Sequence, residues 1–213
     1  MKIEILYPEI CTLYGDKGNT MYLQKCLPDA EFVTTGLNEK PLFLRENIDM
    51  VYMCSMSEKS QELVLDRLMQ YKDEIAACMK DGKALFLLVG NSMELLGDYI
   101  KREDGTRVTG LGVVPGMYSV RQAPNRFNTL IKAKFNDMTL IGYTSRFAHT
   151  YGIPEDMTFC KVEIGQGSNP DTMNEGICKN RVIATYIHGP LLIQNPDFVH
   201  YLLKRLDAPM KEI

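Results

Sequence analysis

The sequence is short of the residues that build metal sites. It has three histidines, and its six cysteines are scattered with no C-x-x-C pair. A structural zinc site needs such residues in closely spaced clusters, so we expect no zinc site. We also expect no cofactor. Several cysteines lie in apolar runs, which is typical of reduced thiols buried in a core.

Long apolar stretches are also missing. The longest run, 84–90, is far shorter than the roughly 20 residues of a membrane helix. The start, MKIEILYPEI, alternates like a strand and has no cleavage site of the signal-peptide type. We therefore expect a cytoplasmic protein with no membrane partner.

Charge of one sign is not in excess. The 24 basic and 27 acidic residues give a net charge of −3, and both signs are mixed along the chain. This balance argues against binding of nucleic acid and favours a small ligand or a protein as the binding partner. With 45% hydrophobic residues, and with no repeat or convincing linker, residues 1–213 are expected to form a single domain.

What is present is an alternation of strands and helices over the first 100 residues. Strands are predicted at 2–7, 30–34, 48–53 and 84–90, and one long helix at 57–79, capped by Ser57 and stopped by Gly82. The run at 84–90 is apolar on both faces, as in the middle of a parallel sheet covered by helices. This predicts an α/β fold with a doubly wound, mostly parallel sheet.

From Gly105 the pattern becomes short alternating runs divided by Gly, Asn and Pro turns, which predicts antiparallel strands in the C-terminal half. These runs are 107–114, 129–135, 138–143, 159–164 and 182–187. A last helix is predicted after Asn195, its cap, with Pro196 in the first turn.

Three stretches could carry chemistry. Residues 87–97 run from a buried strand into a small-residue turn and a helix, which is the frame of a nucleophile elbow or simply a tight connection. His188 ends a strand beside Gly189, and is either a general base or a histidine bonded to the backbone. Cys54 follows another buried strand at the point where a helix begins. Its thiol is either activated by the free amides of that helix or buried in the core without reactivity.

Two further residues are weaker candidates. Arg126, after Asn125, could hold a carboxylate through two parallel hydrogen bonds, or be an ordinary exposed arginine. His149 has less support as a functional residue than His188. The turn 15–20 lacks the spacing of a phosphate loop, so we expect no nucleotide there.

Taken in order, five segments resemble one family over nearly the whole chain: 13–19, 90–97, 111–113, 125–126 and 186–190. The sequence resembles the class I glutamine amidotransferases of the cobyric acid synthase (CobB/CobQ) type. The resemblance implies that an elbow cysteine attacks glutamine, with His188 as the base. It places Arg126 on the glutamine substrate, with Asn125, Asn91 and Ser55 as further substrate-binding positions.

The chain departs from the family where the nucleophile belongs. Against the family pattern C-G-G-Y-Q-x-L-G, the chain reads G-N-S-M-E-L-L-G at 90–97, so Gly90 replaces the cysteine. The family's glycine-rich oxyanion segment corresponds to 54–61 and has lost its glycines as well. Side chains at Ser55 and Met56 would crowd a backbone meant to approach a tetrahedral intermediate.

Two hypotheses follow. In the first, the chain is a glutaminase-deficient subunit that supports a Mur-ligase-like (MurT-type) partner in cell-wall peptidoglycan precursor metabolism, or binds glutamine or a related small carboxylate at the vacated site. In the second, it is an active enzyme in which Cys54 or Ser92 acts with His188. The second requires one of these groups within about 3–4 Å of a His188 ring nitrogen, or close enough to reach it by a rotamer change.

Overall fold

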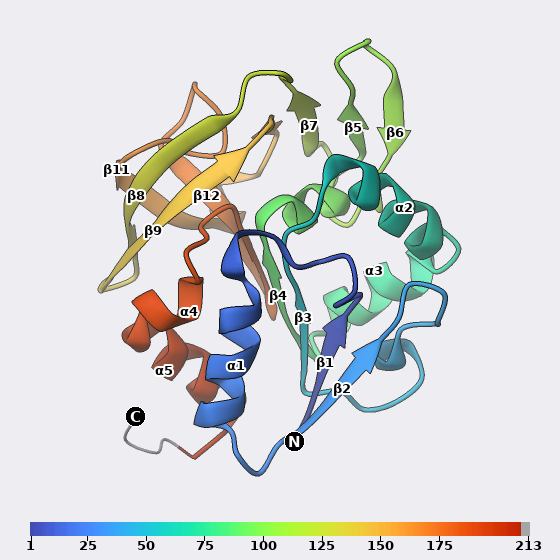
Figure 1. Ribbon diagram of the computed structural model, residues 1–213, viewed down its shortest axis with the longest axis vertical. Coiled ribbons are helices and arrows are strands. Elements are labelled where there is room, and N and C mark those ends of the chain that lie inside the picture. Colours follow the sequence, from blue (N-terminus) through green and yellow to red (C-terminus); the bar gives the residue numbers. More distant parts are fainter. Residues whose placement is uncertain (210–213) are drawn as a thin grey trace.

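The computed structural model describes residues 1–209, and its first half is a layered α/β unit (Figure 1). The four strands run parallel in the order β2-β1-β3-β4. Their bounds are β1 Lys2–Leu6, β2 Glu31–Thr35, β3 Met50–Met53 and β4 Leu85–Val89. All five residues of β4 are buried, as expected for a central strand covered on both faces.

Three longer helices pack on this half, with two short 3-10 turns. They are α1 Lys17–Cys26, α2 Glu58–Met69, α3 Lys72–Asp81, η1 Leu13–Gly15 and η2 Leu42–Leu44. Ser57 caps α2 by accepting a hydrogen bond from Ser60 N, and Gly82 ends α3 with a left-handed φ of 64°. Both signals were predicted and are confirmed.

The single helix predicted over 57–79 is wrong, because the chain breaks it at Gln70 and Tyr71. Leu68 before the break and Ile75 after it both face the core. The apolar spacing therefore continues across the interruption, and periodicity alone could not reveal it.

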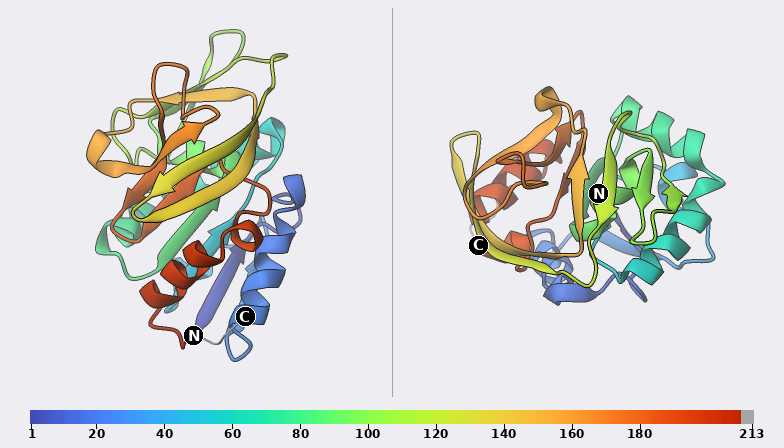
Figure 2. Two further views of the ribbon diagram at one scale, coloured as in Figure 1. Left: turned by 90° about the vertical axis from the view of Figure 1, so that its left-hand side faces the viewer. Right: turned by 90° about the horizontal axis from the view of Figure 1, so that it is seen from above.

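The second half extends the sheet and adds another. β13 pairs in parallel with β4, and beyond it β12, β11, β8 and β9 are antiparallel. Their bounds are β8 Phe127–Phe135, β9 Met138–Arg146, β11 Thr158–Ile164, β12 Asn174–Lys179 and β13 Val182–Thr185. The α/β class, parallel in the first half and antiparallel in the second, is confirmed (Figure 2).

A separate four-stranded sheet has the order β10-β7-β5-β6. Its strands are β5 Tyr99–Lys101, β6 Arg107–Thr109, β7 Tyr118–Arg121 and β10 Ala148–Tyr151. The strand predicted over 107–114 is thus cut short at Thr109, since Gly110 and Gly112 follow it. β5, β7, β10 and β12 were not predicted, and three of them are too short to show a clear alternation.

The remaining elements are η3 Gly90–Leu96, η4 Glu155–Met157, α4 Leu191–Gln194 and α5 Pro196–Arg205. Asn195 does precede α5, but its side chain makes no cap bond; it pairs with the backbone of Ile141 in β9. None of the helices described over 1–209 is long and apolar enough to cross a membrane.

Candidate functional site

The candidate site forms where the parallel strands end. The carboxyl ends of parallel strands meet at one edge of a sheet, which is where ligands bind in such folds. Asp16 follows β1 by way of η1, Ser55 follows β3, Gly90 follows β4, and His188 follows β13. Four segments distant in the sequence therefore meet at one place.

Gly90 lies at the sharp bend between β4 and η3. Its φ is +73°, a left-handed conformation that glycine adopts without strain. A Cβ atom built on it would lie 2.5 Å from His188 Cε1 and 2.9 Å from Ser55 Cβ, and closer still to Ser55 Oγ. Position 90 thus faces His188, as an elbow nucleophile would.

The space beside Gly90 is filled. The Ser55 hydroxyl donates a hydrogen bond to Asp16 Oδ2 at 2.9 Å and lies 3.1 Å from His188 Nδ1. Asp16 is fully buried, and Ser55 and His188 are each 1% exposed. The expectation of a vacated site is therefore wrong at position 90, because Ser55 occupies the volume that a thiol there would need.

This arrangement does not activate Ser55 as a nucleophile. A hydroxyl has one proton, and when that proton goes to Asp16 the oxygen can only accept from His188 Nδ1–H. In a catalytic triad the carboxylate and the nucleophile bond opposite ring nitrogens, whereas here Asp16 Oδ2 and Ser55 Oγ lie 3.6 and 3.1 Å from the same atom, Nδ1. The three residues form a buried structural network.

The backbone amides that border the elbow also have partners. Met56 N donates to Asn91 Oδ1 at 3.0 Å, and Asn91 Nδ2 donates back to Met56 O at 2.8 Å. Ser55 N donates weakly to Asp16 Oδ2 at 3.4 Å. Asn91, predicted to bind substrate, therefore holds the β3–α2 loop against η3.

Two tyrosines lie against His188. The Tyr14 and Tyr143 ring centroids lie 4.7 and 5.7 Å from that of His188, and both tyrosines are half-buried. A pair of backbone hydrogen bonds between Tyr143 and His188 ties the edge strand β9 to the segment after β13. His188 is thus packed from two sides.

The two alternative nucleophiles, Cys54 and Ser92, donate hydrogen bonds to backbone carbonyls. The Cys54 thiol donates to Cys11 O, and burial, together with the charge of Asp16, raises its pKa far above the ordinary value. Ser92 Oγ donates to Val89 O at 2.8 Å. Within residues 1–209, neither is hydrogen-bonded to His188, and their role as nucleophiles stays a prediction.

Asn125 and Arg126 are exposed in the loop between β7 and β8. The Arg126 guanidinium stacks on the Phe147 ring, 4.5 Å from its centroid. Over the described part of the chain, neither residue is hydrogen-bonded to Ser55 or His188. Their substrate-binding role stays a prediction.

Sequence reasoning missed a buried network behind the elbow. Glu94 of η3 accepts hydrogen bonds from Gln61 Nε2 and from the Tyr186 hydroxyl, both at 2.9 Å. Glu175 accepts from Tyr186 N and from Thr185 Oγ1, both at 2.7 Å. Burial raises the pKa of both carboxyls. These bonds fix the segment that carries His188. In the sequence, the only signal of this network is that charged residues occur inside β12 and η3.

His149 provides a test of electrostatics near this network. It is 5% exposed, and its ring packs against that of Phe127 in a tilted arrangement with the centroids 4.0 Å apart. Burial, together with the charge of Arg146, lowers the pKa of His149 to about 4. The folded state therefore disfavours protonation of His149. The stability that depends on neutral His149 is complete above pH 6.5 and declines as the pH falls towards 4.

We expect the native chain to lose about 1–3 kcal/mol of unfolding free energy, relative to His149→Phe, between these two pH values. Urea unfolding of both proteins at each pH measures this difference, and other titrating groups cancel in it. Parallel pH profiles would show that His149 is not held neutral.

Comparison with known proteins agrees with this geometry. Residues 2–196 match the model of the CobB/CobQ-like glutamine amidotransferase domain. The lipid II isoglutaminyl synthase (glutamine-hydrolyzing) subunit GatD of Streptococcus pneumoniae is 26% identical over 207 residues, which is 95% of this chain and 79% of that protein. GatD of Staphylococcus aureus is 26% identical over 196 residues, 91% of this chain and 79% of that protein.

Solved structures share the fold at low sequence identity. A crystal structure of a glutamine amidotransferase superimposes with a TM-score of 0.63 at 14% identity, covering 97% of this chain and 99% of that chain. A chain of PurLQS from Thermotoga maritima gives a TM-score of 0.61 at 11% identity, covering 88% and 86%. With the family match spanning nearly all of the sheet and the elbow, this chain belongs to the CobB/CobQ-like glutamine amidotransferase family.

Proposed function

We propose that this chain is a GatD-like subunit that does not hydrolyse glutamine and acts as a binding partner. The observation that carries the proposal is at the elbow, where Gly90 faces His188 without a side chain and Ser55 fills the space. Removing the nucleophile of a protease triad lowers turnover by about a million-fold. A comparable loss leaves the chain with negligible hydrolysis.

The surroundings of the elbow support the same proposal. A tetrahedral intermediate needs free N–H donors aimed at its oxyanion. In this chain the amides of Ser55 and Met56, in the segment that resembles the family's oxyanion loop, already donate to Asp16 and Asn91. Restoring a thiol alone would therefore leave the charge of the intermediate without these donors.

The partner that we propose is a Mur-ligase-like (MurT-type) enzyme of peptidoglycan precursor metabolism. The support is that the two relatives are each a subunit of a lipid II isoglutaminyl synthase. A subunit without hydrolytic activity can stabilise or regulate such an enzyme, while free ammonia supplies any nitrogen that is transferred.

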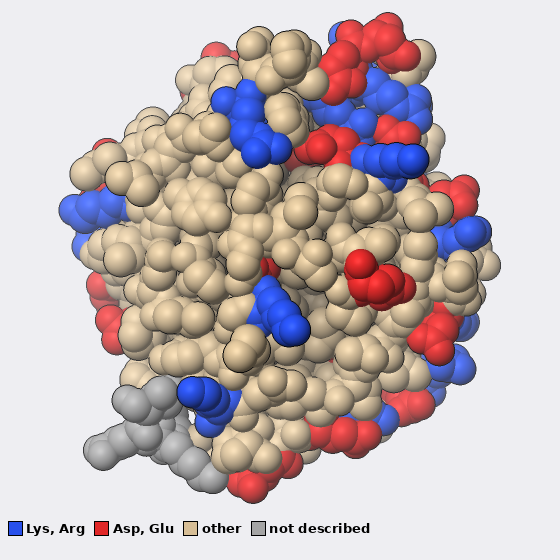
Figure 3. Space-filling view, in the orientation of Figure 1, with Lys and Arg blue, Asp and Glu red and all other residues tan. Residues whose placement is uncertain are grey.

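The surface of the chain also supports a docking role. The face with α1, α4 and β9 carries few charged side chains (Figure 3). Large apolar side chains are exposed on these elements and on β8, among them Met21, Leu130, Ile141 and Ile193. Leu130 and Ile141 are diagonal neighbours on adjacent strands. Such gathered apolar exposure is typical of protein–protein contact.

Co-purification with the Mur-ligase-like protein of the same organism tests this role. We expect a complex that Ile141→Asp weakens by at least about tenfold, since a charge would be buried in the contact. Leu63→Asp, on the exposed face of α2, is the matched control and should leave the affinity within about twofold. No complex at high concentration, or equal loss in both variants, would count against the proposal.

A further inference from the structure

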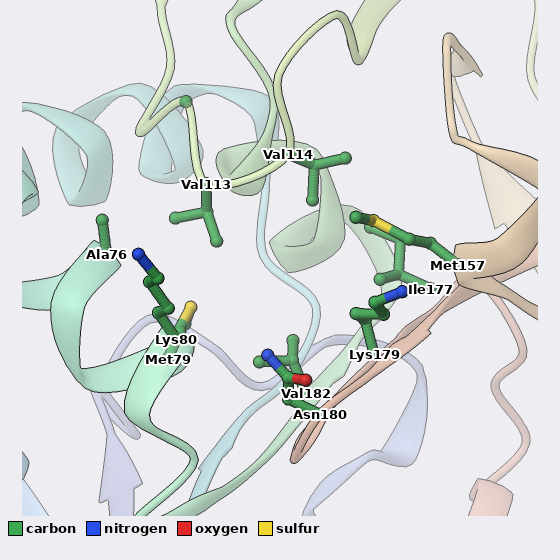
Figure 4. A pocket seen from close by; sticks show the side chains of 11 residues that line it. Ala76, Met79, Lys80, Val113, Val114, Met157, Ile177, Lys179, Asn180 and Val182 are labelled. Atoms are coloured by element: carbon green, nitrogen blue, oxygen red, sulfur yellow. The ribbon is translucent and has the colours of Figure 1, made fainter.

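A pocket of about 240 Å³ lies between α3 and the hairpin of β12 and β13 (Figure 4). Val113 and Val114, from the loop between β6 and β7, border it on one side, opposite Val182 of β13. Further apolar side chains line it: Ala76, Met79, Met157 and Ile177. Its volume is below that of a typical drug-sized site, so it suits a small ligand.

This pocket is distinct from the site at Gly90. Val182 is at the amino end of β13, paired with Phe86, whereas His188 follows the carboxyl end of the same strand. The strand alone separates the two ends by about 10 Å. Neither His188 nor Ser55 lines the pocket.

Two of the three polar side chains that line the pocket are positively charged. Lys80, Lys179 and Asn180 line it, and among the described residues no acidic side chain does. Lys179 Nζ is paired with Asp156 at 2.6 Å, but Lys80 has no ion pair within the described residues. A Cβ built on Gly112, which also lines the pocket, would lie 3.4 Å from Lys72 Nζ and 3.7 Å from Asp98 Oδ1, so charges of both signs lie there. The pocket therefore combines an apolar interior with the Lys80 cation at its rim.

We propose that this pocket binds a small amphiphilic anion of the medium-chain carboxylate class. The alkyl chain would lie among Met79, Val113 and Val182, where it leaves water, and the carboxylate would lie at Lys80 Nζ. Removal of the chain from water supplies most of the affinity, because a half-exposed ion pair adds little. The lysine selects the sign of the charge.

Octanoate is a direct probe of this pocket, and uncharged octanamide is the matched control compound. In the chain labelled at methionine methyl groups, octanoate should shift the Met79 and Met157 signals in a saturable manner. We expect octanamide to bind at least about threefold more weakly, and Lys80→Met to abolish that preference. Lys83→Met, away from this pocket, should keep it.

A second experiment fills the pocket with a larger side chain. Ala76→Leu should weaken octanoate binding by at least about tenfold, whereas Ala77→Leu, which faces the other side of α3, should change it less than about twofold. Thermal unfolding verifies that each variant is folded. The proposal is overturned by unperturbed Met79 and Met157 signals, by equal binding of octanamide, or by equal effects of the two leucines.

Discussion

Gly90→Ala is expected to destabilise the fold by about 2–5 kcal/mol, although it adds only one methyl group. Two physical terms contribute. The left-handed backbone at position 90, where φ is +73°, costs a residue with a Cβ roughly 1–2 kcal/mol. The methyl group must also displace Ser55 and His188, whose Cβ and Cε1 atoms would be 2.9 and 2.5 Å away. Urea unfolding of the native chain and the variant measures the loss.

A double-mutant cycle isolates the part of this cost that is due to Ser55. In the Ser55→Gly background we expect Gly90→Ala to cost about 1–3 kcal/mol less than in the native chain, because the overlapping side chain is gone. Gly105→Ala is the matched control, since φ is +85° there and no atom lies within 4 Å of the added Cβ. Equal costs in both backgrounds would show that Ser55 does not occupy the nucleophile position.

Glu175→Leu is the other substitution with a large expected effect. It removes the acceptor of Tyr186 N and Thr185 Oγ1, both deeply buried, and each lost bond costs about 1–3 kcal/mol. We therefore expect a loss of about 2–5 kcal/mol in unfolding free energy at neutral pH. Because Tyr186 precedes His188 by two residues, the packing of His188 should loosen as well.

Glu175→Gln keeps one carbonyl oxygen as an acceptor, and we expect it to cost at least about 1 kcal/mol less than Glu175→Leu. Glu163→Gln, at an exposed salt bridge with Lys132, should stay within about 0.5 kcal/mol of the native chain. If Glu175→Leu matched this surface control, the buried network would not hold the His188 segment.

Much of the fold could be predicted because its signals are local. The all-apolar run of β4, the cap at Ser57 and the stop at Gly82 each reflect the physics of a few neighbouring residues. The break at Gln70 and Tyr71 could not be predicted, because Leu68 and Ile75 keep the helical spacing across it. The short strands of the second sheet depend on pairing with distant partners.

The candidate site was predictable in part. The resemblance singled out Gly90, Ser55 and His188, and the structure places these residues together. Asp16 was missed as a site residue, since nothing local shows that a carboxylate in a glycine-rich turn is buried beside Ser55. The bonds of Asn91 with Met56 were likewise invisible, because they join loops 35 residues apart.

The losses at the elbow are physically coupled. A thiol at position 90 and a side chain at position 55 compete for one volume, and Asn91 then takes the amide of Met56. A variant that combines Ser55→Gly, Gly90→Cys and Asn91→Gly removes all three obstacles, whereas Gly90→Cys alone removes one. If any glutaminase activity can be restored, we expect it in the triple variant and not in the single one.

Ammonia release from glutamine tests the absence of hydrolysis most directly. The purified chain, alone and mixed with its Mur-ligase-like partner, should release no more ammonia than its His188→Ala variant under the same conditions. Release by the native chain that His188→Ala abolishes would contradict the account, because it would require a working nucleophile beside His188 where we find only Gly90 and the occupied hydroxyl of Ser55.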